Sequence, residues 1–267
     1  RQRVRAAVMQ LGIDLQEYVV TVNLAPAYLR KSGSAFDVAV AVGILAAVGS
    51  LPADALGGVV LLGELSLGGT LHAVRGVLPS LLGARQAGLS RAIIPVANAA
   101  EGAAVQDVDV RAAADLASVV AHLRGTETLP ATSAEPYRGR VAGGVDFSEV
   151  RGQGDARRAL EIAAAGEHNV LMMGPPGAGK TMLARRLPTI LPALTANEAL
   201  EVTTVHSVAG MLRTDAGIVT DRPFRAPHHT ISSAALLGGG DPLRPGEMTL
   251  SHHGVLFLDE LLEFRRH

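Results

Sequence analysis

Gly174-Pro-Pro-Gly-Ala-Gly-Lys-Thr181 is the stretch that decides the fold, because it fits the phosphate-binding pattern G-x-x-x-x-G-K-[ST] at every fixed position. The glycines let such a loop curl so that its backbone N–H groups point at nucleotide phosphates, and the lysine reaches the β and γ oxygens. The Thr181 hydroxyl is a candidate Mg²⁺ ligand. The candidate nucleotide contacts in this loop are Gly174, Pro175, Pro176, Gly177, Ala178, Gly179, Lys180 and Thr181.

The flanks of the loop agree with its usual setting. Residues 170–173, Val-Leu-Met-Met, form an apolar run that predicts a buried strand, and residues 182–187 predict the helix that follows. Such a helix would direct its positive N-terminal end at a bound anion. A plain glycine-rich turn is the alternative, and the strand-loop-helix context disfavours it.

A second motif places Asp259 79 positions after Lys180. Residues 254–260, Gly-Val-Leu-Phe-Leu-Asp-Glu, are an apolar run that ends in two carboxylates. A strand buried on both faces of a parallel sheet has this pattern, and α/β sheets bind ligands at the carboxyl ends of their strands. We therefore expect Asp259 to lie beside the phosphate loop and hold Mg²⁺ with Thr181. Lys180 and Glu260 are the candidate catalytic residues, with Glu260 polarising the attacking water. Alone, the run would fit a strand ending in solvated acids.

Composition restricts the class of protein. The 267 residues suffice for two domains, and the lack of cysteine excludes disulfides and thiolate metal sites. Charged residues make up 18% and the net charge is −1, so charge gives no independent case for nucleic acid. The longest apolar stretch, residues 38–49, is too short to span a bilayer, and no signal peptide is visible. We therefore expect a cytoplasmic protein without a membrane partner. Because the chain begins at Arg1 and ends seven positions after Glu260, we also expect it to be part of a longer protein.

The chain divides at residues 125–144, which are polar and rich in Pro, Gly and Thr, as in a linker. This predicts one domain at residues 1–124 and a second at residues 145–267. Apolar periodicity in the first domain predicts a mixed α/β fold. The expected helices are 3–11, 34–48, 78–87 and 115–123, the expected strands are 18–24 and 92–96, and a hairpin is expected between 59–64 and 70–74.

The sequence resembles the magnesium-chelatase-like AAA+ ATPases of the YifB/ComM type. Residues 222–232, Arg-Pro-Phe-Arg-Ala-Pro-His-His-Thr-Ile-Ser, carry the most specific part of the resemblance. It continues at 238–240, 245–247 and 253–260, and in the first half at 22–26, 31–37 and 63–67. The implied fold class is α/β: a Lon-protease-like (ribosomal S5-type) α/β N-terminal domain, followed by a partial P-loop AAA+ parallel-sheet domain.

The resemblance implies ATP and Mg²⁺ as cofactors and a ring homo-oligomer, expected to be a hexamer. Members of the ComM type act in natural transformation as DNA branch-migration helicases, so DNA is the implied partner. A magnesium chelatase subunit, which couples ATP hydrolysis to metal insertion into a porphyrin, is the alternative, although that motor subunit lacks the Lon-like half. An ATP-dependent protease ranks third. The arginine finger would come from a neighbouring subunit and the sensor residues and lid would follow His267, so we expect the chain alone to hydrolyse ATP poorly.

Two further segments gain candidate roles from the resemblance. Residues 150–153, Val-Arg-Gly-Gln, resemble the AAA+ stretch that borders the adenine, which makes Val150 and Gly152 candidate nucleotide contacts. A plain entry into a helix is the equal alternative. Residues 226–248 resemble an insertion that faces the ring channel, against the alternative of a solvated loop. The candidate substrate contacts in and beside it are Arg225, His228, His229 and Arg244.

The histidine pairs 228–229 and 252–253 resemble metal ligands. Adjacent side chains on a helix or strand diverge, so each pair is expected to offer one ligand at most, and neither pair has the carboxylate spacing of a zincin. The sequence therefore predicts no metal site at either pair.

Ser34 lies where Lon-type proteases carry their nucleophile. A Ser–Lys protease needs a lysine base, and the corresponding position is Leu78. Of the two lysines in the chain, Lys31 shares the loop of Ser34 and Lys180 belongs to the phosphate loop. We therefore expect a proteolytically silent platform in which Ser34 caps a helix.

Overall fold

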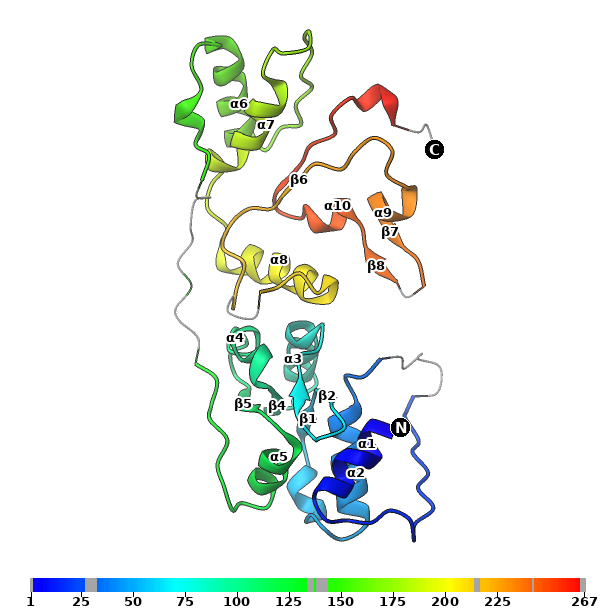
Figure 1. The fold of residues 1–267 in the computed structure, drawn as a ribbon. Coiled ribbons are helices and arrows are strands. Elements are labelled where there is room, and N and C mark those ends of the chain that lie inside the picture. Colours follow the sequence, from blue (N-terminus) through cyan, green and yellow to red (C-terminus); the bar gives the residue numbers. More distant parts are fainter. Residues whose placement is uncertain are drawn as a thin grey trace. The chain divides into compact units, whose positions relative to one another are not determined.

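The structure is a computed structural model that describes residues 2–26, 33–133, 137, 144–213, 217–241 and 243–264. Lys31 and much of the expected linker, residues 125–144, lie outside the described residues. The chain forms two compact units (Figure 1). Unit 1 comprises residues 1–135 and 210–217, and unit 2 comprises residues 136–209 and 218–267.

Unit 1 is built on a three-stranded parallel sheet in the order β1 (Val59–Leu61), β4 (Arg91–Pro95), β5 (Asp109–Ala113). Central strand β4 is apolar and buried from Ala92 onward, as expected for a parallel strand covered on both faces. An antiparallel hairpin of β2 (Glu64–Leu65) and β3 (Leu71–His72) adjoins it, with Leu65 opposite Leu71.

One apolar core holds the helices of unit 1 together. Helix α1 (Gln2–Gln10) packs on α2 (Asp37–Ala47), and α5 (Leu116–Leu123) buries Leu116, Val119 and Val120 in the same cluster. Helices α3 (Val77–Gln86) and α4 (Ala99–Gly102) and the 3₁₀ turns η1 (Ala53–Leu56) and η2 (Val96–Asn98) complete the unit. The longer helices of the unit carry apolar residues at the helical spacing from which the sequence predicts helices.

Helices α1, α2, α3 and α5 and strand β4 confirm the pattern-based predictions. The strand predicted at 18–24 is wrong, and the predicted hairpin forms with a different first strand. Residues 18–24 form no strand, and Val19 is 99% exposed. Residues 59–61 belong to the parallel sheet, while the hairpin forms from β2 and β3. Apolar and β-branched residues favour a strand only where a partner strand is in reach, and sequence alone does not reveal the partner.

Ser34 does not cap a helix. The N-terminal flanking residue of α2 is Phe36, which makes no side-chain cap, and the Ser34 hydroxyl donates to the Glu64 carboxylate. Leu78, at the position where a lysine base would be required, is fully buried, and its N–H donates to Glu101 Oε1 at 2.9 Å. Among the described residues, the hydrogen-bond partner of the Ser34 hydroxyl is therefore a carboxylate and not an amine.

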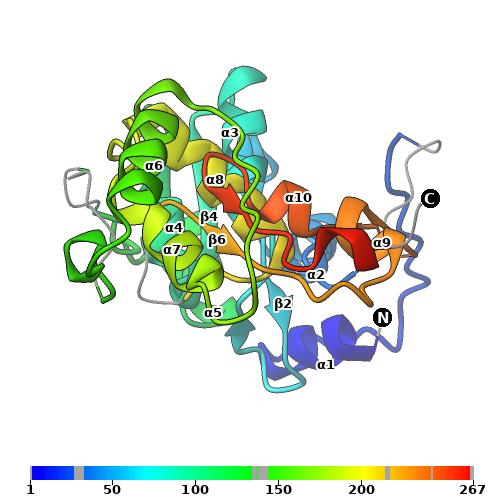
Figure 2. The same ribbon diagram turned by 90° about the horizontal axis from the view of Figure 1, so that it is seen from above.

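Unit 2 consists of helices with short paired strands. Helices α6 (Gly154–Gly166) and α7 (Lys180–Arg186) lie side by side in Figures 1 and 2, and Leu160 and Leu183 bury together between them. Strand β6 (Phe224–Arg225) pairs in parallel with β9 (Val255–Leu256), and β7 (Gly238–Gly239) pairs with β8 (Arg244–Pro245) as a hairpin. The remaining elements are α8 (Ala196–Ala209), α9 (Ser233–Leu237), α10 (Glu247–Leu250), η3 (Phe147–Glu149), η4 (Leu187–Thr189) and η5 (Leu261–Glu263).

Two strand expectations for unit 2 need correction. Residues 170–173 form no strand, with Leu171 72% and Met173 86% exposed. Strand β9 is two residues long and half-buried, not a central strand covered on both faces. Its ladder partner is β6, and the 170–173 segment takes no part in that ladder. Parallel pairing in the described part of unit 2 is therefore confined to β6 and β9. No helix among the described residues is long and apolar enough to cross a bilayer.

Helix α5 offers a test of local stability in unit 1. The Asp115 carboxylate accepts the Ser118 N–H at 2.8 Å and so caps the helix. We expect Asp115→Ala to lower the free energy of unfolding of unit 1 by about 1 kcal/mol, because one N-terminal N–H loses its acceptor. Chemical denaturation followed by circular dichroism measures the change. Glu127→Ala, which removes an exposed carboxylate after the same helix, is the control; an equal loss in both variants would contradict the capping role.

Candidate functional site

The phosphate loop curls because two of its glycines adopt left-handed backbone conformations. Gly177 has φ 79° and Gly179 has φ 82°, a region that favours glycine, and α7 begins directly afterwards at Lys180. The Lys180 ammonium donates to the carbonyls of Gly174, at 2.9 Å, and Pro175, at 3.1 Å. The ammonium group of Lys180, the only lysine in the described residues, thus bonds the backbone of the phosphate loop. Phosphate oxygens of a nucleotide could replace the two carbonyls as acceptors.

The loop is in direct contact with the acidic motif. The Thr181 hydroxyl donates to Asp259 Oδ2 at 2.9 Å across 78 positions of sequence. The other carboxylate oxygen, Oδ1, accepts the Glu260 N–H at 3.1 Å. Hydroxyl and carboxylate oxygens are the ligands that Mg²⁺ prefers, so Thr181 and Asp259 fit a magnesium ion.

Pairing of β9 with β6 positions the acidic motif that follows β9. The N–H groups of Val255 and Phe257 donate to the carbonyls of Pro223 and Arg225, both at 2.8 Å. A side chain at Gly254 is impossible without rearrangement, because its Cβ would lie 2.0 Å from the Pro223 oxygen. The close approach of the two segments thus depends on the glycine that precedes β9.

The Glu260 carboxylate contacts His229. Its Oε2 lies 3.0 Å from His229 Nδ1, and its backbone adopts a left-handed conformation with φ 52°. The resemblance makes His229 a candidate substrate contact, and in the structure its ring contacts the candidate catalytic carboxylate. The neighbouring His228 has Nδ1 2.9 Å from the Thr230 hydroxyl instead.

The segment expected to border the adenine contacts the phosphate loop through Gln153. Val150 is only 2% exposed and packs with Phe147, Leu160 and Leu183. Gly152 is exposed in a turn with φ 68°. The Gln153 amide donates to the Ala178 carbonyl at 3.1 Å, a link between segment and loop that no pattern in the sequence indicated.

The candidate substrate contacts differ in whether their side chains are free to solvent or paired with carboxylates. Arg225 is paired with Glu247, and its Nη2 donates to Oε1 at 2.7 Å. Hydrogen bonding between the two side chains raises the pKa of Arg225 and lowers the pKa of Glu247. Arg244 is exposed on strand β8, and His228 is exposed as well. Of the four candidate substrate contacts, the structure leaves His228 and Arg244 open to solvent and engages Arg225 and His229 with carboxylates.

The second histidine pair contradicts the expectation that adjacent imidazoles diverge. His252 Nε2 and His253 Nε2 both approach Glu201 Oε2, at 2.9 and 2.8 Å. His253 adopts a left-handed conformation with φ 54°, which neither a helix nor a strand provides. The turn therefore presents both rings to one carboxylate.

Comparison with known proteins gives two family matches. The model described as "Magnesium chelatase, subunit ChlI" matches residues 146–267, and "Subunit ChlI of Mg-chelatase" matches residues 1–98. A 97-residue stretch, 36% of the chain, is 30% identical to Lon protease 2 of Bacillus subtilis, covering 17% of that protein. This partial match is consistent with a Lon-like first domain, and the mixed α/β architecture with parallel strands agrees with it.

Several relatives match almost the whole chain. An uncharacterized protein of Mycobacterium tuberculosis is 46% identical over 98% of the chain and 52% of its own length. Competence protein ComM of Haemophilus influenzae is 44% identical over 100% of the chain and 53% of its own length. The uncharacterized protein YifB of Escherichia coli is 41% identical over 100% of the chain and 52% of its own length. The chain thus spans about half the length of these curated relatives, and it belongs to the YifB/ComM family of magnesium-chelatase-like proteins.

Proposed function

We propose that residues 145–267 form the nucleotide-binding part of an AAA+ motor that hydrolyses ATP with Mg²⁺. The observation that carries the proposal is the contact between Thr181 of the phosphate loop and Asp259 of the acidic motif. Two motifs that each fit a triphosphate site are brought together by the fold. Family membership supports the same reading, since the magnesium chelatase family model covers this half of the chain.

Each residue has a role that follows from its chemistry. The loop from Gly174 to Gly179 would offer backbone N–H groups to the phosphates, and the Lys180 ammonium would neutralise the γ-phosphate after leaving its loop carbonyls. Thr181 and Asp259 would hold Mg²⁺, which when bound neutralises charge on the β and γ oxygens. Glu260 would orient the attacking water. Val150 and Gly152 would border the adenine.

His229 is proposed as a positioning residue for Glu260. The imidazole lies 3.0 Å from the Glu260 carboxylate and comes from the segment that resembles a channel-facing insertion. A water-orienting carboxylate works only in a narrow range of positions, so its neighbour controls how often it is in place. Movement of the insertion on contact with substrate would then shift His229 and change the position of Glu260.

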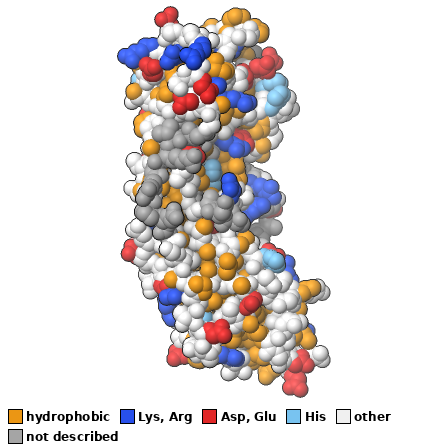
Figure 3. Space-filling view, turned by 60° about the vertical axis from the view of Figure 1, so that its left-hand side comes forward, with side chains coloured by type: hydrophobic (Ala, Val, Ile, Leu, Met, Phe, Trp, Pro, Cys, Tyr) orange, Lys and Arg blue, Asp and Glu red, His pale blue; other side chains and the backbone are white. Residues whose placement is uncertain are grey.

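The motor is proposed to act on DNA as a ring homo-oligomer, with residues 1–124 as a Lon-like platform without peptidase activity. The name of one relative, a competence protein, supports DNA as the substrate. Charge adds little: on the face drawn in Figure 3, basic side chains of the upper part are interspersed with acidic ones. The alternative is a magnesium chelatase-type subunit that works on a porphyrin, which the match to the magnesium chelatase family favours.

Separate substitutions should separate nucleotide binding from hydrolysis. In the natural gene product, we expect Lys180→Ala to weaken ATP binding by about 2–5 kcal/mol, because the phosphates lose their ammonium partner. Glu260→Gln should retain binding and lower kcat by about 10²–10⁴-fold, since a positioned base is lost. Equilibrium binding and steady-state turnover measure both. Arg158→Ala, at an exposed position of α6, is the control; parental binding and turnover in both test variants would refute the assigned roles.

The histidine pair allows a matched comparison. We expect His229→Ala to lower kcat by up to about 100-fold with little change in KM, because Glu260 loses its positioning partner. His228→Ala should leave both constants near the parent values, since that ring contacts Thr230. Steady-state kinetics on the two variants measures the difference. Equal effects of the two substitutions would show that His229 has no special relation to Glu260.

The substrate is tested by stimulation of ATP hydrolysis. Branched or single-stranded DNA should increase the turnover of the natural gene product, and the increase should fall steeply with salt as counterions compete for the phosphates. Measurement of ATPase activity over a salt series checks this. Absence of any DNA effect, together with restored porphyrin metallation in a deficient strain, would favour the chelatase alternative.

A further inference from the structure

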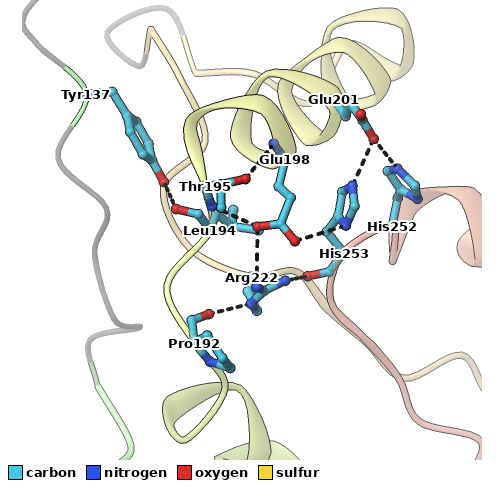
Figure 4. A network of polar contacts seen from close by, with 9 residues as sticks. All are labelled: Tyr137, Pro192, Leu194, Thr195, Glu198, Glu201, Arg222, His252 and His253. Atoms are coloured by element: carbon cyan, nitrogen blue, oxygen red, sulfur yellow. Dashed lines mark hydrogen bonds and ion pairs between the residues drawn. The ribbon is translucent and has the colours of Figure 1, made fainter. Parts of the chain in front are cut away.

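A carboxylate and two imidazoles meet on the surface of unit 2, and none of the three has a role in the proposed nucleotide site. Glu201 lies on α8, and His252 and His253 lie in the turn between α10 and β9 (Figure 4). The two histidine Nε2 atoms lie 2.9 and 2.8 Å from Glu201 Oε2, across 51 and 52 positions of sequence. The fold thus joins three potential metal ligands from two separate segments.

The backbone of the turn holds the two rings together. The left-handed conformation of His253 brings the ring centroids to 4.0 Å with an interplanar angle of 50°. Arg222 fixes the same residue, because its guanidinium donates to the His253 carbonyl at 2.7 Å. The histidines therefore reach Glu201 through an ordered turn.

The spacing of the donor atoms suits a small dication. One ligand atom from each residue lies within 4.8 Å of the others. Bond lengths of about 2.0–2.1 Å place the ligands of a tetrahedral zinc roughly 3.3 Å apart, so small side-chain movements would suffice. We propose that Glu201, His252 and His253 form a binding site for a transition-metal dication such as Zn²⁺, with water as the fourth ligand.

Partial exposure agrees with an open fourth position. The side chains of Glu201, His252 and His253 are 59%, 47% and 26% exposed. Solvent therefore reaches the place where the ligand atoms converge, which gives an ion a path of entry. A site of three protein ligands and one water is the arrangement that proteins use for exchangeable or catalytic zinc.

A second carboxylate supports the most buried ligand. His253 Nδ1 lies 3.5 Å from Glu198 Oε1, as in sites where a carboxylate orients a metal-bound imidazole from behind. Glu198 is fixed by a capping box: its carboxylate accepts the Thr195 N–H at 2.7 Å, and its own N–H donates to the Thr195 hydroxyl. Arg222 adds an ion pair at 3.5 Å. The whole arrangement is visible in Figure 4.

Hydrogen bonds lower the pKa of both carboxylates. Hydrogen bonds from His252 and His253 lower the pKa of Glu201 below its ordinary value. The pKa of Glu198 is lowered chiefly by the hydrogen bond from the Thr195 backbone.

The donor set selects the class of metal. Imidazole nitrogen suits zinc, copper, nickel and cobalt, whereas Mg²⁺ and Ca²⁺ prefer oxygen ligands throughout. The site differs in this respect from the oxygen pair of Thr181 and Asp259. A bound ion would join α8 to the turn that leads into β9, so it would stabilise the segment that carries the acidic motif.

The test uses the untagged natural gene product after dialysis against a chelator. We expect about one Zn²⁺ to bind per chain, Co²⁺ to give the intense visible absorption of four-coordinate cobalt, and either metal to raise the thermal midpoint. Glu201→Gln and His252→Ala should each abolish the cobalt absorption. Glu198→Gln, which keeps the capping box, should weaken Zn²⁺ binding by about 10- to 100-fold. His168→Ala, at an exposed histidine of the same unit, should change nothing.

Two outcomes would overturn the site. One is that Glu201→Gln and His252→Ala leave the Zn²⁺ affinity of the parent protein unchanged, which includes the case in which none of the three proteins binds Zn²⁺. The other is metal binding that Asp259→Asn removes and Glu201→Gln retains, which would place the ion in the nucleotide site. The metal readouts do not require ATP hydrolysis, so failure of this site and failure of the proposed motor are distinguishable.

Discussion

The hydrogen bond between Thr181 Oγ1 and Asp259 Oδ2, 2.9 Å long, is the contact on which the candidate nucleotide site depends. It closes a loop of 78 positions, and its formation has to offset the entropy of that closure. One hydrogen bond is too weak for this, so the packing of β6 on β9 and of α6 on α7 must hold the two motifs in register. The site is thus a product of the whole of unit 2.

Both ends of the acidic segment are held by polar side chains. Before β9, Arg222 and Glu201 hold the His252–His253 turn, and after β9, Thr181 and His229 hold the two carboxylates. The proposed metal site and the proposed nucleotide site therefore act on the same short strand from opposite ends. An ion bound at the proposed metal site would therefore restrict movement of the segment that carries Asp259 and Glu260.

Local motifs allowed the phosphate loop and the acidic pair to be predicted, because their chemistry requires fixed residue types at fixed spacing. Partners of strands were not predictable: the apolar runs 18–24 and 170–173 remain unpaired, and β5 was missed because Asp109 and Arg111 interrupt its apolar pattern. The convergence of His252 and His253 depends on a left-handed backbone at a residue that is not glycine. Such a conformation is decided by tertiary packing, here by Arg222 and Glu201.

A double-mutant cycle on the Thr181–Asp259 contact tests the central claim most directly. The affinity of the natural gene product for ATP with Mg²⁺ would be measured in the parent, Thr181→Val, Asp259→Asn and the double variant. If the two side chains act on one metal–nucleotide complex, their effects should be non-additive, with a coupling of about 0.5–3 kcal/mol. Additivity within about 0.5 kcal/mol would show that the two motifs act independently, and the account of a shared site would be wrong.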